Sequence, residues 1–498
     1  MGVVVRQSII TSIISYIGVA IGYLNLFYLY PKYLGTDQVG LLRAIQDGAM
    51  LLTPFASFGL VQCIIRFYPH FSKNEEGAKS FISLIVLLAL MGFGILNLFF
   101  FIFQSSVISF FSAKAPEVNQ HIGLVLWLTF TLLYTTLFEQ YSRSQLKIAV
   151  PALLREVGIR IVQALLVSFY FLKWIDFEQF LFLSVMGYVL MLITLIFYLI
   201  SLGTLTLTFR VDKIKKEKLK EIIAFGSISF IGMSSMVLIA KMDSIMVTGF
   251  LGLEANAIYT TAYYMATVIE IPKRAITQSA MPLLAQSFDN NNFEGVKRIY
   301  IKSSINQLII GALLLIGVWA NLNNIFALMP NGEVYKSGMM VVMIVGTAKL
   351  LDMAFGPSSE IIGLSKYYWF NLVVISFLSV LIVVTNYLLI PRYGITGAAY
   401  GSLVALTVYN SAKFIFIKVK LNIQPFIGNT LKVVLIAGAT IILNQSLPVF
   451  SNVLFDLLFR SAIITIFYSA MILIGRCSED ANLLFAKGLT LIGWRSKS

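Results

Sequence analysis

The stretch that decides the fold runs from Phe81 to Phe103 and reads FISLIVLLALMGFGILNLFFFIF. Its 23 residues include no Asp, Glu, Lys or Arg. A helix of about 20 mostly apolar residues is long enough to cross the hydrocarbon core of a bilayer. The stretch therefore predicts a membrane-spanning helix, and similar apolar runs recur along the whole chain.

These runs are separated by short polar connections and predict an all-α integral membrane protein with about 14 transmembrane helices. The expected spans are residues 7–30, 41–69, 80–104, 121–142, 148–172, 177–203, 221–250, 257–285, 299–321, 334–356, 367–390, 394–418, 429–450 and 452–475. The composition agrees, since 58% of the 498 residues are hydrophobic, 12% are charged and the mean hydropathy is +0.86. Soluble domains contain about 25% charged residues, so an ordinary soluble enzyme and a disordered protein are excluded.

The basic residues predict the orientation of the chain. With the N-terminus in the cytoplasm, 22 of the 37 Lys and Arg residues lie in or beside cytoplasmic segments, and five lie on the opposite side. Because cytoplasmic loops carry the excess of Lys and Arg, both termini are expected in the cytoplasm. The linker at residues 206–220 holds the largest basic cluster and is expected to lie as an amphipathic helix against anionic membrane lipids. The basic cluster from Arg210 to Lys220 lacks interleaved aromatic residues, so a nucleic-acid partner is not expected.

Two halves of the chain resemble each other at an offset of 217 residues. The segment from Tyr33 to Leu41, YLGTDQVGL, is similar to FLGLEANAI from Phe250 to Ile258, and Pro54 and Pro272 fall at nearly the same place in their spans. Six spans per repeat predict two six-helix lobes related by a pseudo-two-fold axis along the membrane normal. The lobes are expected at residues 1–205 and 221–420, and residues 421–498 are expected to add two helices and a cytoplasmic tail.

Two further motifs carry a resemblance to a known family. DSIMVTGFLG (Asp243 to Gly252), followed by AIYTTAYY (Ala257 to Tyr264), resembles bacterial polysaccharide flippases, as does LLIPRYGITGAAY (Leu388 to Tyr400). The family is the polysaccharide-transport branch of the multidrug/oligosaccharidyl-lipid/polysaccharide exporter superfamily, which includes O-antigen flippases of lipopolysaccharide synthesis. The resemblance implies a multi-pass protein of the bacterial inner membrane. It also implies flipping of polyprenyl-diphosphate-linked oligosaccharide by alternating access, with membrane lipids, a polysaccharide polymerase and glycosyltransferases as partners.

Ten basic and seven acidic residues fall inside the expected spans, so the membrane interior carries a cationic excess. Arg and Lys bind phosphate oxygens through charge-assisted hydrogen bonds. The residues predicted to bind the substrate diphosphate are Arg43, Arg155, Arg160, Lys273, Arg274 and Lys349. The alternative is pairing within a helix, because Arg43/Asp47, Glu156/Arg160, Glu270/Lys273, Lys349/Asp352 and Asp456/Arg460 lie three or four residues apart. Residues near span ends, among them Lys413, are expected to extend toward the interface.

The source of energy is expected to lie outside this chain. The sequence contains no GxxxxGK[ST] phosphate loop, and its two cysteines and two histidines form no metal-ligand pattern. No cofactor, metal or catalytic residue is therefore predicted. An H⁺ gradient, an Na⁺ gradient or the membrane potential can act on buried carboxylates, for which the candidates are Asp47, Asp243, Glu270 and Asp352.

Two other functions are compatible with the sequence. One is a cation-coupled drug or metabolite exporter of the same superfamily, which would favour an acidic cavity. The other is an enzyme, either a glycan polymerase or a glycosyltransferase, which would need a large extramembrane loop with catalytic groups. No such loop is present between the expected spans, so the sequence predicts a protein that is not an enzyme.

Overall fold

The structure is a computed structural model and describes residues 3–208, 214 and 216–491. Its contacts divide the chain into two compact units, Met1–Ile258 and Tyr259–Ser498. Helix α11 (Lys216–Leu251) packs on α3, α4 and α5, so its contacts assign it to the first unit. In the expected lobes, this span was instead the first helix of the second lobe. Residues 209–213 and 215 of the expected basic linker, and the tail from residue 492, lie outside the described residues.

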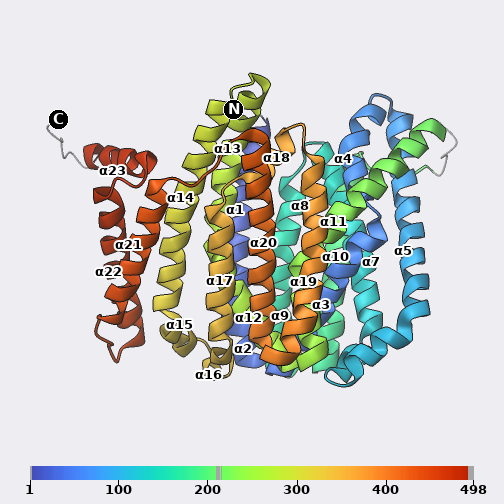
Figure 1. Cartoon of the computed structure of the whole chain (residues 1–498). Helices are drawn as coiled ribbons and strands as arrows, with labels where there is room; N and C mark the ends of the chain where they lie inside the picture. Colours follow the sequence, from blue (N-terminus) through green and yellow to red (C-terminus); the bar gives the residue numbers. More distant parts are fainter. Residues whose placement is uncertain (1–2, 209–213, 215, 492–498) are drawn as a thin grey trace. The chain divides into compact units, whose positions relative to one another are not determined.

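The first unit is built from helices, several of which contain or adjoin a π-helical segment. Its elements are α1 (Val3–Leu24), η1 (Asn25–Leu29), α2 (Tyr30–Tyr33), α3 (Thr36–Ser57), α4 (Leu60–Phe71), α5 (Glu75–Ser112), α6 (Pro116–Gln120), α7 (Ile122–Ser144), α8 (Ala149–Leu153), η2 (Leu154–Gly158), α9 (Ile159–Phe171), α10 (Phe177–Ser201) and α11 (Lys216–Leu251), with the start of α12 (Leu253–Thr267). Figure 1 shows these helices in blue to green. Their apolar contacts include a core of α4, α5, α7 and α10 side chains such as Ile64, Phe81, Leu137 and Leu195.

The second unit is also helical. After the rest of α12 it contains η4 (Val268–Glu270), α13 (Ile271–Asp289), α14 (Phe293–Ala320), α15 (Leu322–Leu328), α16 (Gly332–Tyr335), η5 (Lys336–Gly338), α17 (Met339–Ala354), α18 (Ser358–Leu364), α19 (Trp369–Tyr393), α20 (Ile395–Leu421), α21 (Gly428–Gln445), α22 (Val453–Ile474) and α23 (Glu479–Leu491). Helix α23 runs across the direction of α22 (Figure 1). Asp480, in the first turn of α23, contacts Lys302 and Asn306 of α14.

The expected spans are found as helices. Among the described residues, ten helices are long and apolar enough to cross a membrane, and α3 with α4 forms an eleventh candidate bent by 46°. The remaining three expected spans are α8–η2–α9 and α12–η4–α13, which are interrupted by a π or a 3₁₀ segment, and the shorter α21. The prediction of an all-α membrane protein with about 14 spans is therefore confirmed.

The helix boundaries repeat at the offset found in the sequence. Helix α3 begins at Thr36 and α12 begins at Leu253, which is 217 residues later. In each unit the same span is then broken, between α3 and α4 in one and at η4 in the other. Helix α5 begins at Glu75 and α14 at Phe293, in agreement with the one-residue insertion. The duplication seen in the residues thus extends to local structure.

The break between α3 and α4 depends on a glycine. Gly59 has φ +76°, a left-handed conformation that residues with a Cβ rarely adopt. A Cβ at this position would lie 2.1 Å from the carbonyl oxygen of Gly226 in α11. The bend therefore combines a backbone conformation and a close helix contact that both favour glycine.

Replacing Gly59 by alanine is expected to destabilise the first unit by about 2–4 kcal/mol, from backbone strain and the collision with Gly226. The buried thiol of Cys63 on α4 provides the readout. In a Cys477→Ala background, labelling of Cys63 by a thiol-reactive dye should begin at a lower temperature. Gly94→Ala is the matched control, because a Cβ there meets nothing within 4 Å. An unchanged labelling temperature in the Gly59 variant would contradict this account of the bend.

Candidate anion-binding site

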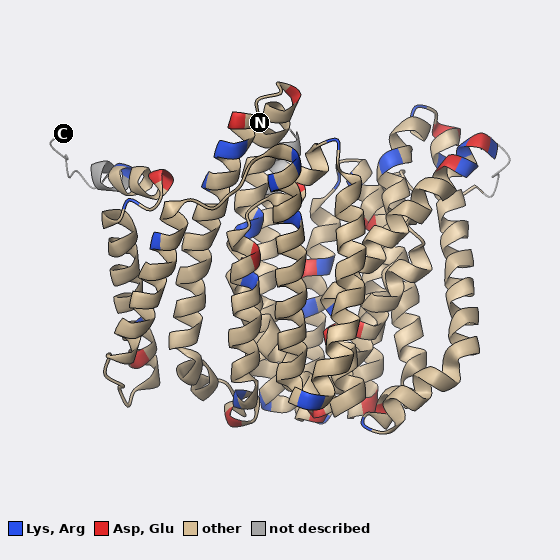
Figure 2. Cartoon of the chain, in the orientation of Figure 1, with Lys and Arg blue, Asp and Glu red and all other residues tan. Residues whose placement is uncertain are grey.

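Charged residues are concentrated at the ends of the helices, but a few lie midway along them (Figure 2). Charges at membrane depth are costly unless they are paired or face a polar cavity, so these few residues are the first place to look for a site. The two units each contain such a group.

In the second unit, two ion pairs join the end of η4 and the start of α13 to α17. Lys349 Nζ lies 2.9 Å from Glu270 Oε2, and Lys273 Nζ is paired with Asp352 Oδ2. The acid Glu270 comes three residues before the base Lys273, whereas on α17 the base Lys349 comes three residues before the acid Asp352. Both pairs therefore join residues that are 79 positions apart in the sequence. The result is a two-rung ladder, named the α13–α17 ladder, that contains four of the predicted site residues.

Helix α20 completes the surroundings of Asp352. The side-chain amide of Asn410 donates to Asp352 Oδ1 at 3.0 Å. One turn along, Lys413 is 3% exposed, donates to Ser359 Oγ at 3.0 Å, and lies 3.9 Å from the ring centre of Tyr409. Within the described part of the chain, the amine of Lys413 thus contacts a hydroxyl and an aromatic face, and makes no ion pair with a carboxylate.

The group has a positive formal charge when the exposed Arg274, which follows Lys273 in the sequence, is counted with it. Lys273, Lys349 and Lys413 lie among the three acids Glu270, Asp352 and Glu360, and Glu360 of α18 interacts electrostatically with Lys273 and Lys413. Arg274 is exposed on α13 and makes no ion pair within the described residues. An exposed basic side chain that follows Lys273 in the sequence and has no acid of its own is suited to an incoming anion.

In the first unit, the predicted residues Arg43 and Asp47 both lie on α3 but have different partners. Asp47 pairs with Lys241 of α11 at 2.6 Å, and both side chains are largely buried. Arg43 donates to Gln46 at 3.3 Å and lies 5.8 Å from the ring centre of Tyr30. Asp243, the fourth candidate for ion coupling, is buried on α11 two residues from Lys241.

A second group in this unit surrounds the π-helix η2. Arg155 bridges Glu139 of α7 at 2.8 Å and Glu156 at 3.1 Å, and Arg160 pairs with Glu156 at 3.2 Å. Two acids and two bases therefore balance. Arg155 still exposes 54% of its side chain, so its guanidinium has room for a further partner.

Helix α1 passes directly over this segment. A Cβ on Gly18 would lie 2.5 Å from the carbonyl oxygen of Glu156, and the Asn25 amide donates to the Arg160 carbonyl at 2.8 Å. Small residues allow membrane helices to approach this closely. A change in the position of α1 would therefore also shift Glu156 and Arg160.

The sequence profile of a family described as polysaccharide biosynthesis protein matches residues 4–288, which is more than half of the 498 residues. The chain belongs to this family. A comparison with curated proteins found no match.

The fold of this polysaccharide biosynthesis family member is similar to several solved structures. The lipid II flippase MurJ in an inward closed conformation matches with a TM-score of 0.76 and 12% identity, over 94% of this chain and 99% of that chain. An inward-facing multidrug resistance MATE family transporter of the MOP superfamily matches with a TM-score of 0.63 and 14% identity, over 82% and 98%. A MOP superfamily transporter from Pyrococcus furiosus matches with a TM-score of 0.56 and 15% identity, over 84% and 95%.

The structure pairs most membrane charges between helices rather than within them. Glu270, Lys273, Lys349 and Asp352 each find a partner on the other helix, and Asp47 pairs with α11. Pairing within one helix is found for Glu156/Arg160 and Asp456/Arg460. A charged side chain that faces a neighbouring helix is held by complementary charge there, so spacing along one helix does not identify its partner.

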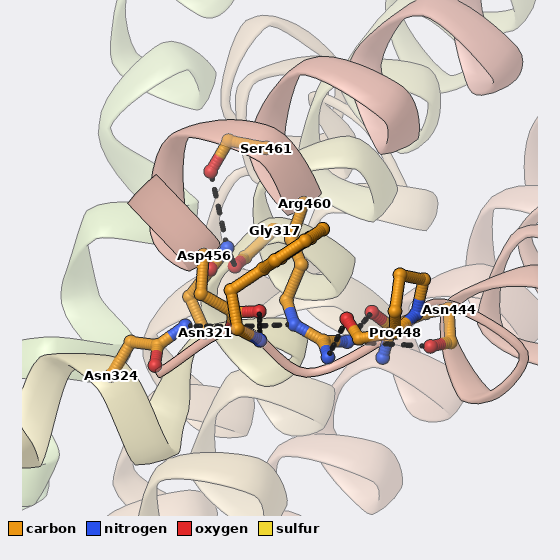
Figure 3. Close-up of polar contacts among 9 residues, drawn as sticks. Gly317, Asn321, Asn324, Asn444, Pro448, Asp456, Arg460 and Ser461 are labelled. Atoms are coloured by element: carbon orange, nitrogen blue, oxygen red, sulfur yellow. Dashed lines mark hydrogen bonds and ion pairs between the residues drawn. The ribbon is translucent and has the colours of Figure 1, made fainter. Parts of the chain in front are cut away.

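The Asp456/Arg460 pair is part of a separate polar cluster at one end of α22 (Figure 3). Arg460 donates to Asp456 at 2.7 Å, to Asn444 Oδ1 at 3.1 Å and to the Pro448 carbonyl at 2.9 Å. Asp456 also accepts from Asn324 of α15 at 2.6 Å. Both charged side chains are almost fully buried, so this cluster holds the α21–α22 hairpin on α15 and is not a candidate anion site.

Sequence reasoning missed three residues of the candidate site. Lys413 was expected to extend to the interface, but α20 continues to Leu421 and the amine is buried. Asn410 and Lys241 were not singled out as partners of the acids. The signal was available in part, because Tyr409, Asn410 and Lys413 are polar residues three or four positions apart, or adjacent, within an expected span.

Proposed function

We propose that this protein is a flippase that moves polyprenyl-diphosphate-linked oligosaccharide from the inner to the outer leaflet of the bacterial cytoplasmic membrane. The observation that carries the proposal is the positively charged group around the α13–α17 ladder, at membrane depth in a member of a polysaccharide biosynthesis family. A diphosphate carried through a membrane needs several cationic donors in a place that excludes most water.

Binding of the diphosphate is proposed to replace the carboxylate partners of two lysines with phosphate oxygens. Lys273 and Lys349 are each neutralised by one carboxylate, which makes the buried charges tolerable while the site is empty. Arg274 would attract the diphosphate first, and the two lysines would then turn from Asp352 and Glu270 to the phosphate oxygens. In the first unit, Arg155, Arg160 and Arg43 are proposed as further diphosphate ligands.

The same exchange offers a route to ion coupling. A carboxylate that loses its lysine but stays away from water is more stable with a proton or a bound cation. Asp352 and Glu270 are proposed to take this role in the second unit, with Asp47 and Asp243 as the corresponding candidates in the first. Substrate entry and ion uptake would then depend on the same side chains.

The proposed orientation in the membrane rests on the distribution of Lys and Arg residues along the chain. Both termini are proposed to lie in the cytoplasm, and the two six-helix lobes with two added helices are proposed to alternate access from one side to the other. A polysaccharide polymerase and glycosyltransferases would act before and after this step. The O-antigen of lipopolysaccharide is one polysaccharide whose synthesis requires it.

The competing proposal is a cation-coupled drug or metabolite exporter of the same fold. In the MOP superfamily transporter from Pyrococcus furiosus, the reverse polarity of the binding pocket suggests a different function. The sign of charge in the pocket is therefore a reasonable guide, and a basic group favours an anionic cargo over a cationic drug.

The test uses the purified full chain in vesicles that hold a fluorescent oligosaccharide linked to a polyprenyl diphosphate. Transport to the opposite leaflet should exceed that of protein-free vesicles, and the same oligosaccharide on an uncharged polyprenyl ether should not be moved. Equal transport of both lipids would contradict a diphosphate-binding mechanism. Uptake of cationic dyes without movement of the diphosphate lipid would favour the exporter.

A further inference from the structure

The first unit contains a hollow whose lining shares no residue with the charged groups described above. It has a volume of about 840 Å³ and lies between the start of α7 and the start of α10. Its lining combines polar side chains (Gln120, His121, Glu178, Gln179) with apolar and aromatic ones (Leu124, Trp174, Ile175, Phe182, Leu183). Sites for small organic ligands have this size and this mixture.

The charged pair in this hollow is neutral as a unit. His121 Nδ1 lies 2.8 Å from the Glu117 carbonyl oxygen, which can only accept, so Nδ1 donates. His121 Nε2 lies 2.9 Å from Glu178 Oε2, and a hydrogen bond there needs one proton on either the imidazole or the carboxyl. In both cases the charges of His121 and Glu178 sum to zero. Because no other lining residue is ionisable, the hollow suits a neutral ligand.

Two amide side chains remain available to such a ligand. Gln179 Oε1 accepts from the Asp176 amide at 3.0 Å, but its Nε2 has no protein partner within the described residues. The Gln120 side chain is exposed and likewise makes no hydrogen bond to the described part of the chain. Together with the exposed carboxyl oxygen of Glu178, these groups offer both donors and acceptors, as vicinal hydroxyl groups require.

The aromatic wall provides a flat apolar surface beside these groups. The Trp174 side chain is 69% exposed and is supported on one face by Phe169, with ring centres 5.2 Å apart. Phe182, 51% exposed, follows further along α10. An indole ring that is held in place costs little entropy when a ligand packs on its free face.

We propose that this hollow is a binding site for a neutral saccharide, which packs the C–H face of one sugar ring on Trp174 and bonds its hydroxyl groups to Gln120, Gln179 and Glu178. The connections that carry Gln120 and Trp174 lie on the side opposite the cytoplasmic termini in the proposed orientation. The assignment of the bound sugar to a flipped lipid-linked oligosaccharide rests on the proposed function. Saccharide binding itself does not.

The experiment uses the purified full chain in nanodiscs of phosphatidylcholine and saturation-transfer difference NMR. The probes are three neutral disaccharides: maltose, lactose and chitobiose. At least one should receive saturation, and the signal should fall about tenfold in Trp174→Ala, in line with the loss of one aromatic contact. Trp369→Ala is the matched control, since this tryptophan of the second unit is also exposed and its loss should leave the signal unchanged.

A second variant, Gln120→Ala, tests the proposal if Trp174→Ala does not fold. The exposed Gln120 side chain makes no hydrogen bond to the described residues, so its loss should not affect folding. The saturation of the sugar should also fall in this variant. Absence of saturation for all three sugars, or an equal signal in wild type and both variants, would overturn the proposal. Loss of the wild-type signal when phosphatidylethanolamine replaces phosphatidylcholine would assign the hollow to a phospholipid headgroup and overturn it too. Failure of lipid flipping in vesicles would leave sugar binding unaffected, so the two proposals fail separately.

Discussion

Neutralising Lys273 and Arg274 together, as Lys273→Gln with Arg274→Gln, is expected to reduce transport of a polyprenyl-diphosphate-linked oligosaccharide by at least about a hundredfold. Hydrogen bonds to charged groups contribute about 1.5–3 kcal/mol each, and two of them correspond to this factor or more. Lys273 is a rung of the α13–α17 ladder, and Arg274 is the exposed cation beside it. The measurement is the initial rate of flipping in vesicles with equal amounts of inserted protein.

The chain contains its own matched control for this experiment. Lys297 and Arg298 form the same Lys-Arg dipeptide near the start of α14, where Arg298 is exposed and the partly exposed Lys297 pairs loosely with Glu294 at 3.7 Å. Changing both of these residues to glutamine removes the same charge but should leave the flipping rate within about twofold, because exposed ion pairs contribute little. A loss of activity in both double variants would point to net charge rather than to a site.

The double variant leaves Asp352 without its lysine, and this could impair folding instead of binding. Adding Asp352→Asn removes that uncompensated charge while keeping a partner for Asn410. The triple variant is therefore expected to insert and fold normally and still fail to transport. Full transport by the folded double or triple variant would rule out this diphosphate site.

The fold was predictable because its main determinant, the series of long apolar runs, is visible directly in the sequence. Apolar runs such as residues 81–103 must become helices in a bilayer, where each backbone polar group needs an internal partner. The offset between Thr36 and Leu253 was also readable, since a duplication preserves helix boundaries as well as residues. The interruptions at η2 and η4 were not, because they depend on local backbone hydrogen bonding and on packing against neighbouring helices.

The candidate site was predictable in its members but not in its pairing. Lys273, Lys349, Glu270 and Asp352 were each identified because charges are rare inside spans. Their partners depend on the rotation of α13 and α17 about their axes, and a single sequence does not give that rotation. Lys413 shows the same difficulty, since its hydrogen-bond partner Ser359 lies on another helix, α18, although Tyr409 lies one turn earlier on its own helix.

Replacing Arg460 by methionine is expected to destabilise the second unit by about 3 kcal/mol. The variant removes the hydrogen bonds to Asn444 and Pro448 and leaves the Asp456 carboxylate buried without its cation (Figure 3). Breaking a buried pair on one side commonly costs about 3–5 kcal/mol. The buried thiol of Cys477, which follows α22, reports the effect in a Cys63→Ala background, where dye labelling should begin at a lower temperature.

The double variant Asp456→Leu with Arg460→Met separates charge from packing. It removes both charges at once, so roughly half of the lost stability should return, although Asn324 and the Phe450 amide still lose their acceptor. Gly94→Ala, in the other unit, should leave Cys477 labelling unchanged. If the single and double variants were equally destabilised, the cost would come from the lost loop contacts rather than from the isolated carboxylate. If neither were destabilised, Asp456 and Arg460 would not be what holds the α21–α22 hairpin on α15.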